Sequence, residues 1–192
     1  MKRKKKVLVL LGSPRRKGNS SILAEKIAEG AESEGAEAAF VFIHEMKIEP
    51  CRSCYACQVP GSKGCSIDDE MQKLYPLMME ADAWVIASPV YWFTMSAQIK
   101  LWMDRCFAFP AYAEDPFSTK KIAIAMSYGG EDPFDSGCIN ALRTFQDAYG
   151  YVGAQIVGYA YGSAMKAGEI KKNRVLMAAA EELGKKLVKA VR

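Results

Sequence analysis

The stretch VLVLLGSPRRKGNSS, residues 7–21, decides the fold of this chain. Its first five residues form a short apolar run that stops at Gly-Ser-Pro, as a strand buried on both faces of a sheet does. From Ser20 to Gly35 apolar residues recur every four positions, the pattern of an amphipathic helix, and the final glycine is a helix stop. The stretch therefore predicts a strand, a polar loop and a helix in succession.

The same alternation continues to the end of the chain. We expect further strands at Ala38 to Ile43, Trp84 to Ala87, Ile122 to Met126 and Gln155 to Tyr159, and further helices from Asp68 or Asp69 onward, at Ser96 to Phe107, and around the apolar positions 139–149 and 176–191. Five strands that alternate with five helices predict an α/β fold with a doubly wound, five-stranded parallel sheet and helices on both faces. The 192 residues, half of them hydrophobic, suit one sizeable core, so a single domain over residues 1–192 is expected.

Composition and charge narrow the range of partners. The net charge of +4 comes largely from basic runs at the two ends, including Lys2 to Lys6 and Arg192. Aromatic residues do not interleave these runs, so we expect no nucleic-acid partner. No apolar run approaches the roughly eighteen residues of a membrane span, and Val7 to Leu11 is too short for a secretion signal. We therefore expect a cytoplasmic protein with no membrane partner.

The loop Gly12 to Ser21 has the composition of an anion site. Parallel sheets of this kind bind ligands outside the carboxyl ends of their strands, where this loop lies. The loop leads into a helix N-terminus, which favours anions. Its hydroxyl, amide and basic donors are Ser13, Arg15, Asn19, Ser20 and Ser21. The loop lacks a P-loop lysine and the glycine spacing of a dinucleotide fold, which favours a monoester phosphate that is held and not transferred. The alternative is a polar loop in which Asn19 caps the helix.

Several motifs in order resemble one known family. Gly-Ser-Pro-Arg at 12–15 and Gly-Asn-Ser-Ser at 18–21 resemble the phosphate loop of the NADPH-dependent FMN reductase family, a flavodoxin-fold group. Ser88 to Trp92, then Lys100 with the pair Asp104-Arg105, then Ser127 to Gly130 follow in the family's order. The resemblance implies a flavodoxin-like fold, FMN held through its phosphate by residues 12–21, and NAD(P)H as the source of hydride.

A flavin ring needs a flat, mostly apolar slot. The resemblance implies that the ring is framed by Pro89, Val90, Tyr91, Trp92 and Phe93, and that its far edge is closed by Ser127, Gly129 and Gly130. The alternative for Trp92 and Phe93 is packing in the core, where Trp84 and Trp102 are expected. No catalytic side chain is expected, because the flavin carries the chemistry. We interpret His44 as structural and Asp104-Arg105 as an ion pair or interface contact.

A cysteine cluster lies in a long loop, residues 47–67, after the second strand. Without a secretion signal, the spacing Cys51-x2-Cys54-x2-Cys57-x7-Cys65 favours metal or redox chemistry over disulfides. Three cysteines at successive spacings of two, completed by a fourth, suit a [4Fe-4S] cluster, while free redox-active thiols and zinc remain open. Iron-sulfur flavoproteins of the same family carry a compact motif of this kind near FMN. Cys106 and Cys138 are expected to be buried packing residues.

Together these features predict an FMN-dependent oxidoreductase. It takes hydride from NAD(P)H and passes electrons to a quinone, flavin or protein acceptor, with a [4Fe-4S] cluster as a possible exit route. The alternatives are a non-enzymatic, flavodoxin-like electron carrier and a thiol or metal redox sensor. Relatives of this type usually complete the flavin site across a subunit boundary, which implies a homodimer or homotetramer.

Overall fold

The computed structural model describes residues 3–191 and contains a parallel sheet of five strands. Met1, Lys2 and Arg192, which the expected domain and terminal basic runs include, lie outside the described residues. The strand order is β2-β1-β3-β5-β6. The strands are β1 (Lys6–Leu11), β2 (Glu37–Phe42), β3 (Ala83–Tyr91), β5 (Lys121–Tyr128) and β6 (Gln155–Ser163), with a two-residue β4 (Thr94–Met95) antiparallel to β3. This order confirms the predicted flavodoxin-like fold.

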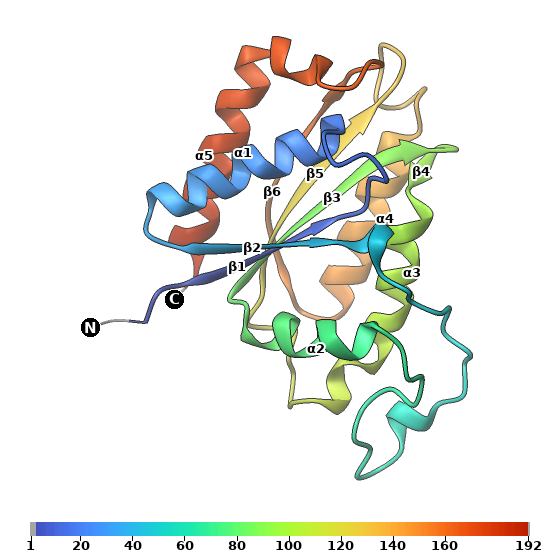
Figure 1. Cartoon of the computed structure of the whole chain (residues 1–192). Helices are drawn as coiled ribbons and strands as arrows, with labels where there is room; N and C mark the ends of the chain where they lie inside the picture. The colour runs from blue at the N-terminus through green and yellow to red at the C-terminus, as the bar shows by residue number, and fades with distance from the viewer. Residues whose placement is uncertain (1–2, 192) are drawn as a thin grey trace.

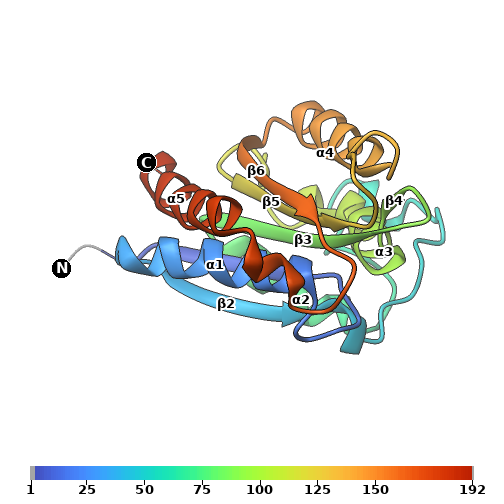
Figure 2. The same cartoon turned by 90° about the horizontal axis from the view of Figure 1, so that it is seen from above.

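Helices cover both faces of the sheet (Figures 1 and 2). They are α1 (Asn19–Ser33), α2 (Met71–Glu80), α3 (Ala97–Arg105), α4 (Cys138–Tyr151) and α5 (Arg174–Ala190). Because successive residues of a strand point to opposite faces, β1 supplies Val7 and Val9 to the core under α1 and α5, and Leu8 and Leu10 to the core under α2, α3 and α4. Among residues 3–191, no helix is long and apolar enough to cross a bilayer.

Helices α1 and α5 pack with almost no side chain between them. A Cβ atom on Gly184 of α5 would lie 1.9 Å from the carbonyl oxygen of Ile27, and one on Gly30 of α1 would lie 1.9 Å from that of Glu181. Each glycine therefore faces the partner helix's backbone, which cannot move aside as a flexible side chain could. The strands beneath present small residues on this face, including Ala83, Ala123 and Ala160, so both helices lie close to the sheet.

The prediction for the third strand was wrong at its carboxyl end. We expected a strand at Trp84 to Ala87 followed by an open loop, but β3 continues through Ser88 and Pro89 to Tyr91. Trp92 and Phe93 then reverse the chain with φ values of 47° and 67°, and β4 pairs back onto β3. Two aromatic residues in the left-handed region give no turn signal, because such turns normally use asparagine or glycine.

We expect Gly184→Ala to lower the free energy of unfolding by about 2 kcal/mol, because the new methyl group meets backbone and forces the two helices apart. Gly150→Ala is the matched control, since a Cβ atom at Gly150 of α4 meets nothing within 4 Å. That variant should be neutral or more stable by up to about 1 kcal/mol. Urea unfolding measures both, and equal stability of the two variants would contradict the close packing of α1 on α5.

Candidate functional site

The carboxyl ends of β1 and β3 are joined by two buried serines. The N–H of Gly12 donates to the carbonyl oxygen of Ala87 at 2.9 Å, and the Ser96 hydroxyl donates to the carbonyl oxygen of Gly12 at 2.9 Å. Ser88 in turn accepts the N–H of Ser96 at 2.8 Å. Ser88 was expected only as the first residue of the motif that ends at Trp92, and this junction was not predicted, although small polar residues at two neighbouring strand ends are a signal of it.

The loop between β1 and α1 forms a cradle for an anion. The helical hydrogen bonds of α1 begin with the N–H of Ile22, which donates to the carbonyl oxygen of Gly18 at 3.0 Å. The N–H groups of Asn19, Ser20 and Ser21 precede it in the first turn, where helical N–H groups have no carbonyl partner in the helix. The Ser20 side chain is buried, and its hydroxyl has no hydrogen-bond partner among the residues that the structure describes. A buried hydroxyl without a partner is costly, and a bound anion at the helix N-terminus would satisfy it.

Two glycines keep this cradle narrow. A Cβ atom on Gly12 would lie 2.2 Å from Cγ1 of Ile99, and one on Gly18 would lie 2.7 Å from the Ser13 hydroxyl oxygen. Ser13 is buried and accepts the N–H of Arg15 at 3.1 Å, which folds the loop back on itself. The loop is therefore shaped before any ligand binds.

Asn19 faces away from the anion cradle. Its Nδ2 donates to the carbonyl oxygens of Ala164 at 3.2 Å and Lys166 at 3.0 Å, and its Oδ1 accepts the N–H of Ile170 at 3.3 Å. The helix cap is Gly18, so the alternative in which Asn19 caps the helix is wrong. The side chain instead ties α1 to the loop after β6. That loop lies at the same edge as the others, because the carboxyl ends of all five parallel strands meet there.

The basic residues of the loop divide into two kinds. Arg16 forms an ion pair with Glu45 and lies 4.6 Å above the centre of the Phe42 ring. Arg15 and Lys17 are exposed, and neither forms an ion pair with any residue between 3 and 191. The charges of Arg15 and Lys17 are therefore left available to a ligand.

The hairpin of β3 and β4 presents aromatic side chains to solvent. Trp92 is 92% exposed, Phe93 55% and Tyr91 43%, so the alternative of core packing for Trp92 and Phe93 is wrong. Trp84 and Trp102 are buried, as predicted. Pro89 is buried and pairs in register with Ser127 of β5, and Val90 is half-buried.

The far side of the same edge is built from the ends of β5 and β6. Ser127 is buried, and Gly130 adopts a φ of 83° at the turn that follows β5. The Ser163 hydroxyl donates to the carbonyl oxygen of Gly130. A Cβ atom on Gly129 would lie 2.5 Å from the sulfur of Met165, so the loop after β6 covers this glycine. The structure thus places residues 12–21, 89–93 and 127–130 along one edge of the sheet.

A model of the NADPH-dependent FMN reductase family matches residues 5–168. The chain belongs to this family. It is 38% identical to an iron-sulfur flavoprotein of Archaeoglobus fulgidus over 125 residues, which cover 65% of this chain and 62% of that protein. A second iron-sulfur flavoprotein of that organism is 31% identical over 192 residues, 96% of this chain and 80% of that one. The chain thus matches less than two thirds of the first relative's length.

Solved structures support the fold. The structure of an NAD(P)H:quinone oxidoreductase from Methanothermobacter marburgensis superposes with a TM-score of 0.74 at 20% identity, over 96% of this chain and 98% of that chain. The family's cofactor is FMN. The cradle around Ser20 fits a phosphate monoester, because it offers a hydroxyl without a partner among the described residues and free helical N–H groups, with the exposed Arg15 in the same loop.

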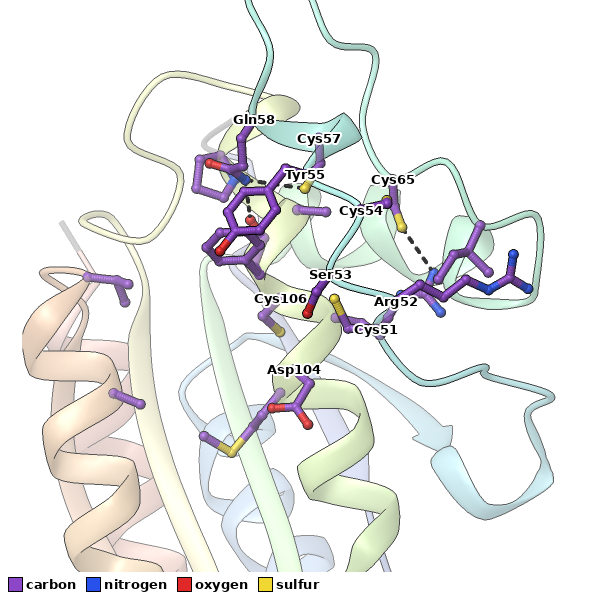
Figure 3. Close-up of a pocket in the computed structure, with 18 of the residues that line it drawn as sticks. Cys51, Arg52, Ser53, Cys54, Tyr55, Cys57, Gln58, Cys65, Asp104 and Cys106 are labelled. Carbon is purple, nitrogen blue, oxygen red and sulfur yellow. Dashed lines mark hydrogen bonds between the residues drawn. The ribbon is translucent and has the colours of Figure 1, made fainter.

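The cysteine loop borders a cavity of about 750 Å³ beside the C-terminal ends of α3 and α4 (Figure 3). All four cysteines of the motif, Cys51, Cys54, Cys57 and Cys65, line it. The Cys54 sulfur lies 3.4 Å from the Ser66 hydroxyl oxygen, and the Cys57 sulfur accepts from Gln58 at 3.2 Å. Within residues 3–191, no three His, Cys, Asp or Glu side chains are placed to hold a metal ion. The thiols therefore share a cavity without forming an ion site.

The cysteine loop extends away from the edge that carries residues 12–21, 89–93 and 127–130. It leaves the carboxyl end of β2, and Figure 1 shows it, in teal, extending beyond the sheet below α3. Helix α3 begins beside Ser96 at the family's flavin edge and ends at Arg105 beside the cavity, so its nine residues separate the two by roughly 14 Å. The phosphate loop and the thiols are thus at opposite ends of one helix.

Burial separates the reactive thiols from the structural ones. The bond with Ser66 lowers the pKa of the exposed Cys54. Burial raises the pKa of Cys138 to about 11 and that of Cys106 further, and both are buried as predicted. The thiolate form that reacts and binds metal is therefore favoured at Cys54 and disfavoured at Cys106 and Cys138.

Two smaller interpretations were tested by the geometry. Asp104 and Arg105 do not pair with each other: Asp104 binds Lys100 at 2.6 Å on the surface, and Arg105 binds Asp69 at 2.5 Å in the interior. Adjacent residues of a helix point about 100° apart, so the ion pair between them is wrong, while an interface contact of the exposed Asp104 stays a prediction. His44 is exposed at the end of β2, where Nδ1 lies 3.2 Å from Nε2 of Gln98, in keeping with a structural role.

Proposed function

We propose that this protein is an FMN-dependent oxidoreductase that accepts hydride from NAD(P)H and passes electrons to a quinone, flavin or protein acceptor. The observation that carries the proposal is the anion cradle, in which the buried Ser20 hydroxyl has no partner within residues 3–191. Family membership supplies the chemistry, because bound FMN accepts hydride from a nicotinamide and releases electrons to an acceptor. The quinone oxidoreductase among the structural neighbours supports this class of acceptor.

In this proposal each loop has one task. Ser13, Ser20 and Ser21, with the N–H groups at the start of α1, hold the FMN phosphate, and Arg15 contributes charge from the surface. The Asn19 side chain binds the loop after β6 instead of the phosphate, which its neighbours bind. Pro89 to Phe93 frame the ring, and Ser127, Gly129 and Gly130 lie along its other edge. The missing Cβ of Gly130 leaves its backbone open to a ligand, while that of Gly129 makes room for the Met165 sulfur.

The exposed hairpin supports an assembly of copies. Trp92 and Phe93 are exposed aromatic residues in left-handed backbone, a conformation that costs about 1 kcal/mol or more per residue. Asn140 donates to the carbonyl oxygen of Phe93 at 3.0 Å, and Gly137 packs against Phe93. These contacts with α4 fix the hairpin in its exposed position. We propose that a second copy covers it in a homodimer or homotetramer and completes the flavin pocket.

The electron-carrier alternative makes a different prediction for NADPH. A reductase loaded with FMN should lose its flavin absorbance within seconds of NADPH addition under anaerobic conditions, because nicotinamide reaches the ring directly. A carrier should keep its colour and be reduced only by a partner protein or dithionite. Stopped-flow absorbance spectroscopy measures the rate, and persistence of the flavin spectrum with both NADPH and NADH would contradict the proposal.

Ser20→Ala should separate binding from folding. We expect it to weaken FMN binding by about tenfold or more, because a hydrogen bond to a charged phosphate is lost. The FMN-free protein should be equally stable or more stable, since the variant removes a buried hydroxyl without a partner. Ser33→Ala at the far end of α1 is the control, because Ser33 bonds only the Gly30 carbonyl oxygen of its own helix. Flavin fluorescence titration measures the affinity, and equal affinities of the two variants would argue against the cradle.

A second role, for the cysteine loop, rests on the cavity that all four thiols line. We propose that the loop binds a [4Fe-4S] cluster, which the names of two relatives support. Because the thiols do not form an ion site in this arrangement, binding requires the segment from Cys51 to Cys57 to close toward Cys65. Zinc and free redox-active thiols are the competing outcomes.

Metal content decides among these outcomes. Protein purified without oxygen should contain about four iron and four sulfide per chain, because a cubane needs four of each. Cys57→Ser should lose most of the iron, while the matched control Cys138→Ser, in the core at the start of α4, should keep it. Zinc in place of iron, or no metal with intact FMN binding, would overturn the cluster and leave the flavin proposal standing.

A further inference from the structure

Arg105 is a buried cation beside the cysteine loop. It is the last residue of α3 and is 1% exposed, and Asp69, its partner, is 5% exposed at the side chain. A buried charge is tolerated only with close partners, because removing it from water is expensive. Desolvation opposes ionisation of Asp69, but the bonds from Arg105 and from backbone N–H groups outweigh it and hold the Asp69 pKa below its usual range. The pair is therefore a fixed structural element.

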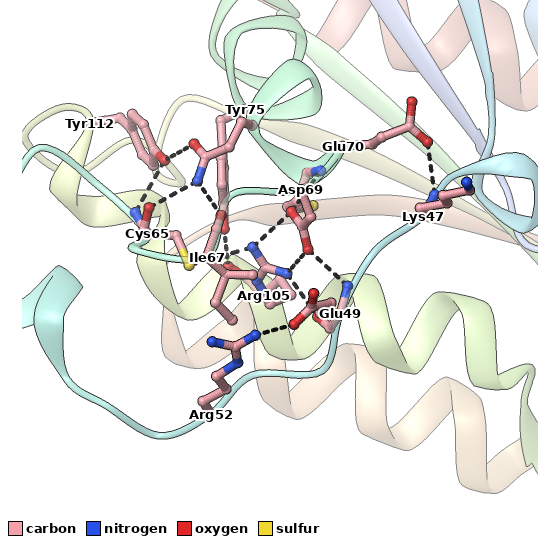
Figure 4. A network of polar contacts seen from close by, with 12 residues as sticks. Lys47, Glu49, Arg52, Cys65, Ile67, Asp69, Glu70, Tyr75, Arg105 and Tyr112 are labelled. Atoms are coloured by element: carbon pink, nitrogen blue, oxygen red, sulfur yellow. Dashed lines mark hydrogen bonds and ion pairs between the residues drawn. The ribbon is translucent and has the colours of Figure 1, made fainter.

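The guanidinium joins both stems of the cysteine loop (Figure 4). On the incoming stem, Nη1 donates to the carbonyl oxygen of Glu49 at 2.7 Å. On the outgoing stem, Nη1 and Nη2 bind the two carboxylate oxygens of Asp69 at 2.5 and 3.1 Å, and Nη2 donates to the sulfur of Cys65 at 3.4 Å. One side chain thus contacts the loop at three points that are up to twenty residues apart in sequence.

Asp69 completes the closure from the other side. Its Oδ2 accepts the N–H of Glu49 at 2.8 Å, and its Oδ1 accepts the N–H of Met71 at the start of α2 at 3.0 Å. Both carboxylate oxygens therefore bind Arg105 and one backbone N–H each. The incoming stem, the outgoing stem and α2 are held at a single point.

Cys65 is fixed far more tightly than the other thiols of the loop. Its N–H donates to the Tyr112 hydroxyl at 3.2 Å and its carbonyl oxygen accepts from Gln72 at 2.8 Å, in addition to the contact of its sulfur with Arg105. The segment that carries Cys51, Cys54 and Cys57 instead runs through left-handed residues, Ser53 and Tyr55, with φ values of 50° and 56°. Cys51 and Cys54 are exposed.

We propose that Arg105 is the positioning residue of the cysteine loop: with Asp69 it closes the stems and holds Cys65 as the fixed thiol toward which the Cys51 to Cys57 segment folds. That the loop binds an iron-sulfur cluster rests on the proposed function. The ordering of the loop by Arg105 does not rest on it, and the experiment below measures this ordering in protein without a cluster. Lysine cannot replace arginine here, because a single ammonium cannot span Glu49, Asp69 and the Cys65 sulfur as the planar fork does.

The experiment follows the alkylation of each cysteine by iodoacetamide in the full-length, FMN-loaded chain, with any iron first removed by chelation. It compares the limiting rates at high pH, where loss of the Arg105 charge no longer changes the thiolate fraction of Cys65. Arg105→Met should speed the alkylation of Cys65 by about tenfold or more, because loss of a hydrogen bond to a charged group raises the open population by that factor. Arg105→Lys, which keeps the pair with Asp69, should give an intermediate rate. Hydrogen exchange over residues 49–69 should rise in parallel.

The alkylation rate of Cys138 and the affinity for FMN distinguish a positioning role of Arg105 from a general loss of structure. If Arg105 acts on the loop, Cys138 stays unreactive and FMN affinity is unchanged in each variant. Asp104→Asn, which removes the neighbouring surface pair with Lys100, should match the wild type in every measurement. Arg105→Met combined with Asp69→Asn removes both buried charges, so it leaves no unpaired charge if the single variant fails to fold. A folded variant lacking Arg105 in which Cys65 reacts at the wild-type rate, or in which Cys138 reacts as fast as Cys65, would overturn the proposal.

Discussion

The parallel pairing of β1 with both β2 and β3 is the constraint on which the rest of the molecule depends. The chain leaves β1 in one direction across the sheet to β2 and returns in the other to β3, so the first loop lies where the strand order reverses. Backbone bonds fix this arrangement, and the bonds of Gly12 to Ala87 and Ser96 carry it into the loop. The anion cradle thus inherits its rigidity from the sheet.

Much of this could be predicted because it depends on local pattern. Apolar runs, helical spacing and the polar loop at Gly12 are legible in the sequence, since a doubly buried strand admits few other residues. The hairpin at Trp92 and Phe93 could not be predicted, because its left-handed turn is imposed by contacts with α4 and not by its own residues. The same holds for Asn19, whose partners lie some 150 positions away on the loop after β6.

The candidate site shows a similar division. Candidate site residues could be chosen by residue type. Because the carboxyl ends of parallel strands meet at one edge of the sheet, the phosphate loop, the aromatic hairpin and the glycine turn could also be predicted to lie there. The position of the cysteine loop could not be predicted in this way, because the loop is long enough to extend away from the edge at which it starts. Its position is set instead by side chains from α3 and from the segment after it, such as Arg105 and Tyr112, and sequence spacing contains no information on those contacts.

Helix α3 links these two regions physically. Its first turn is capped by Ser96, which also holds the phosphate loop, and its last residue, Arg105, closes the cysteine loop. Trp102, between them, is fully buried against Trp84 of the central strand, so the helix cannot shift at one end without disturbing the core. A rigid helix with a polar anchor at each end keeps the two loops at a fixed separation. Electron exchange between a flavin and a group on the cysteine loop would require such a fixed separation, and neither loop could provide it alone.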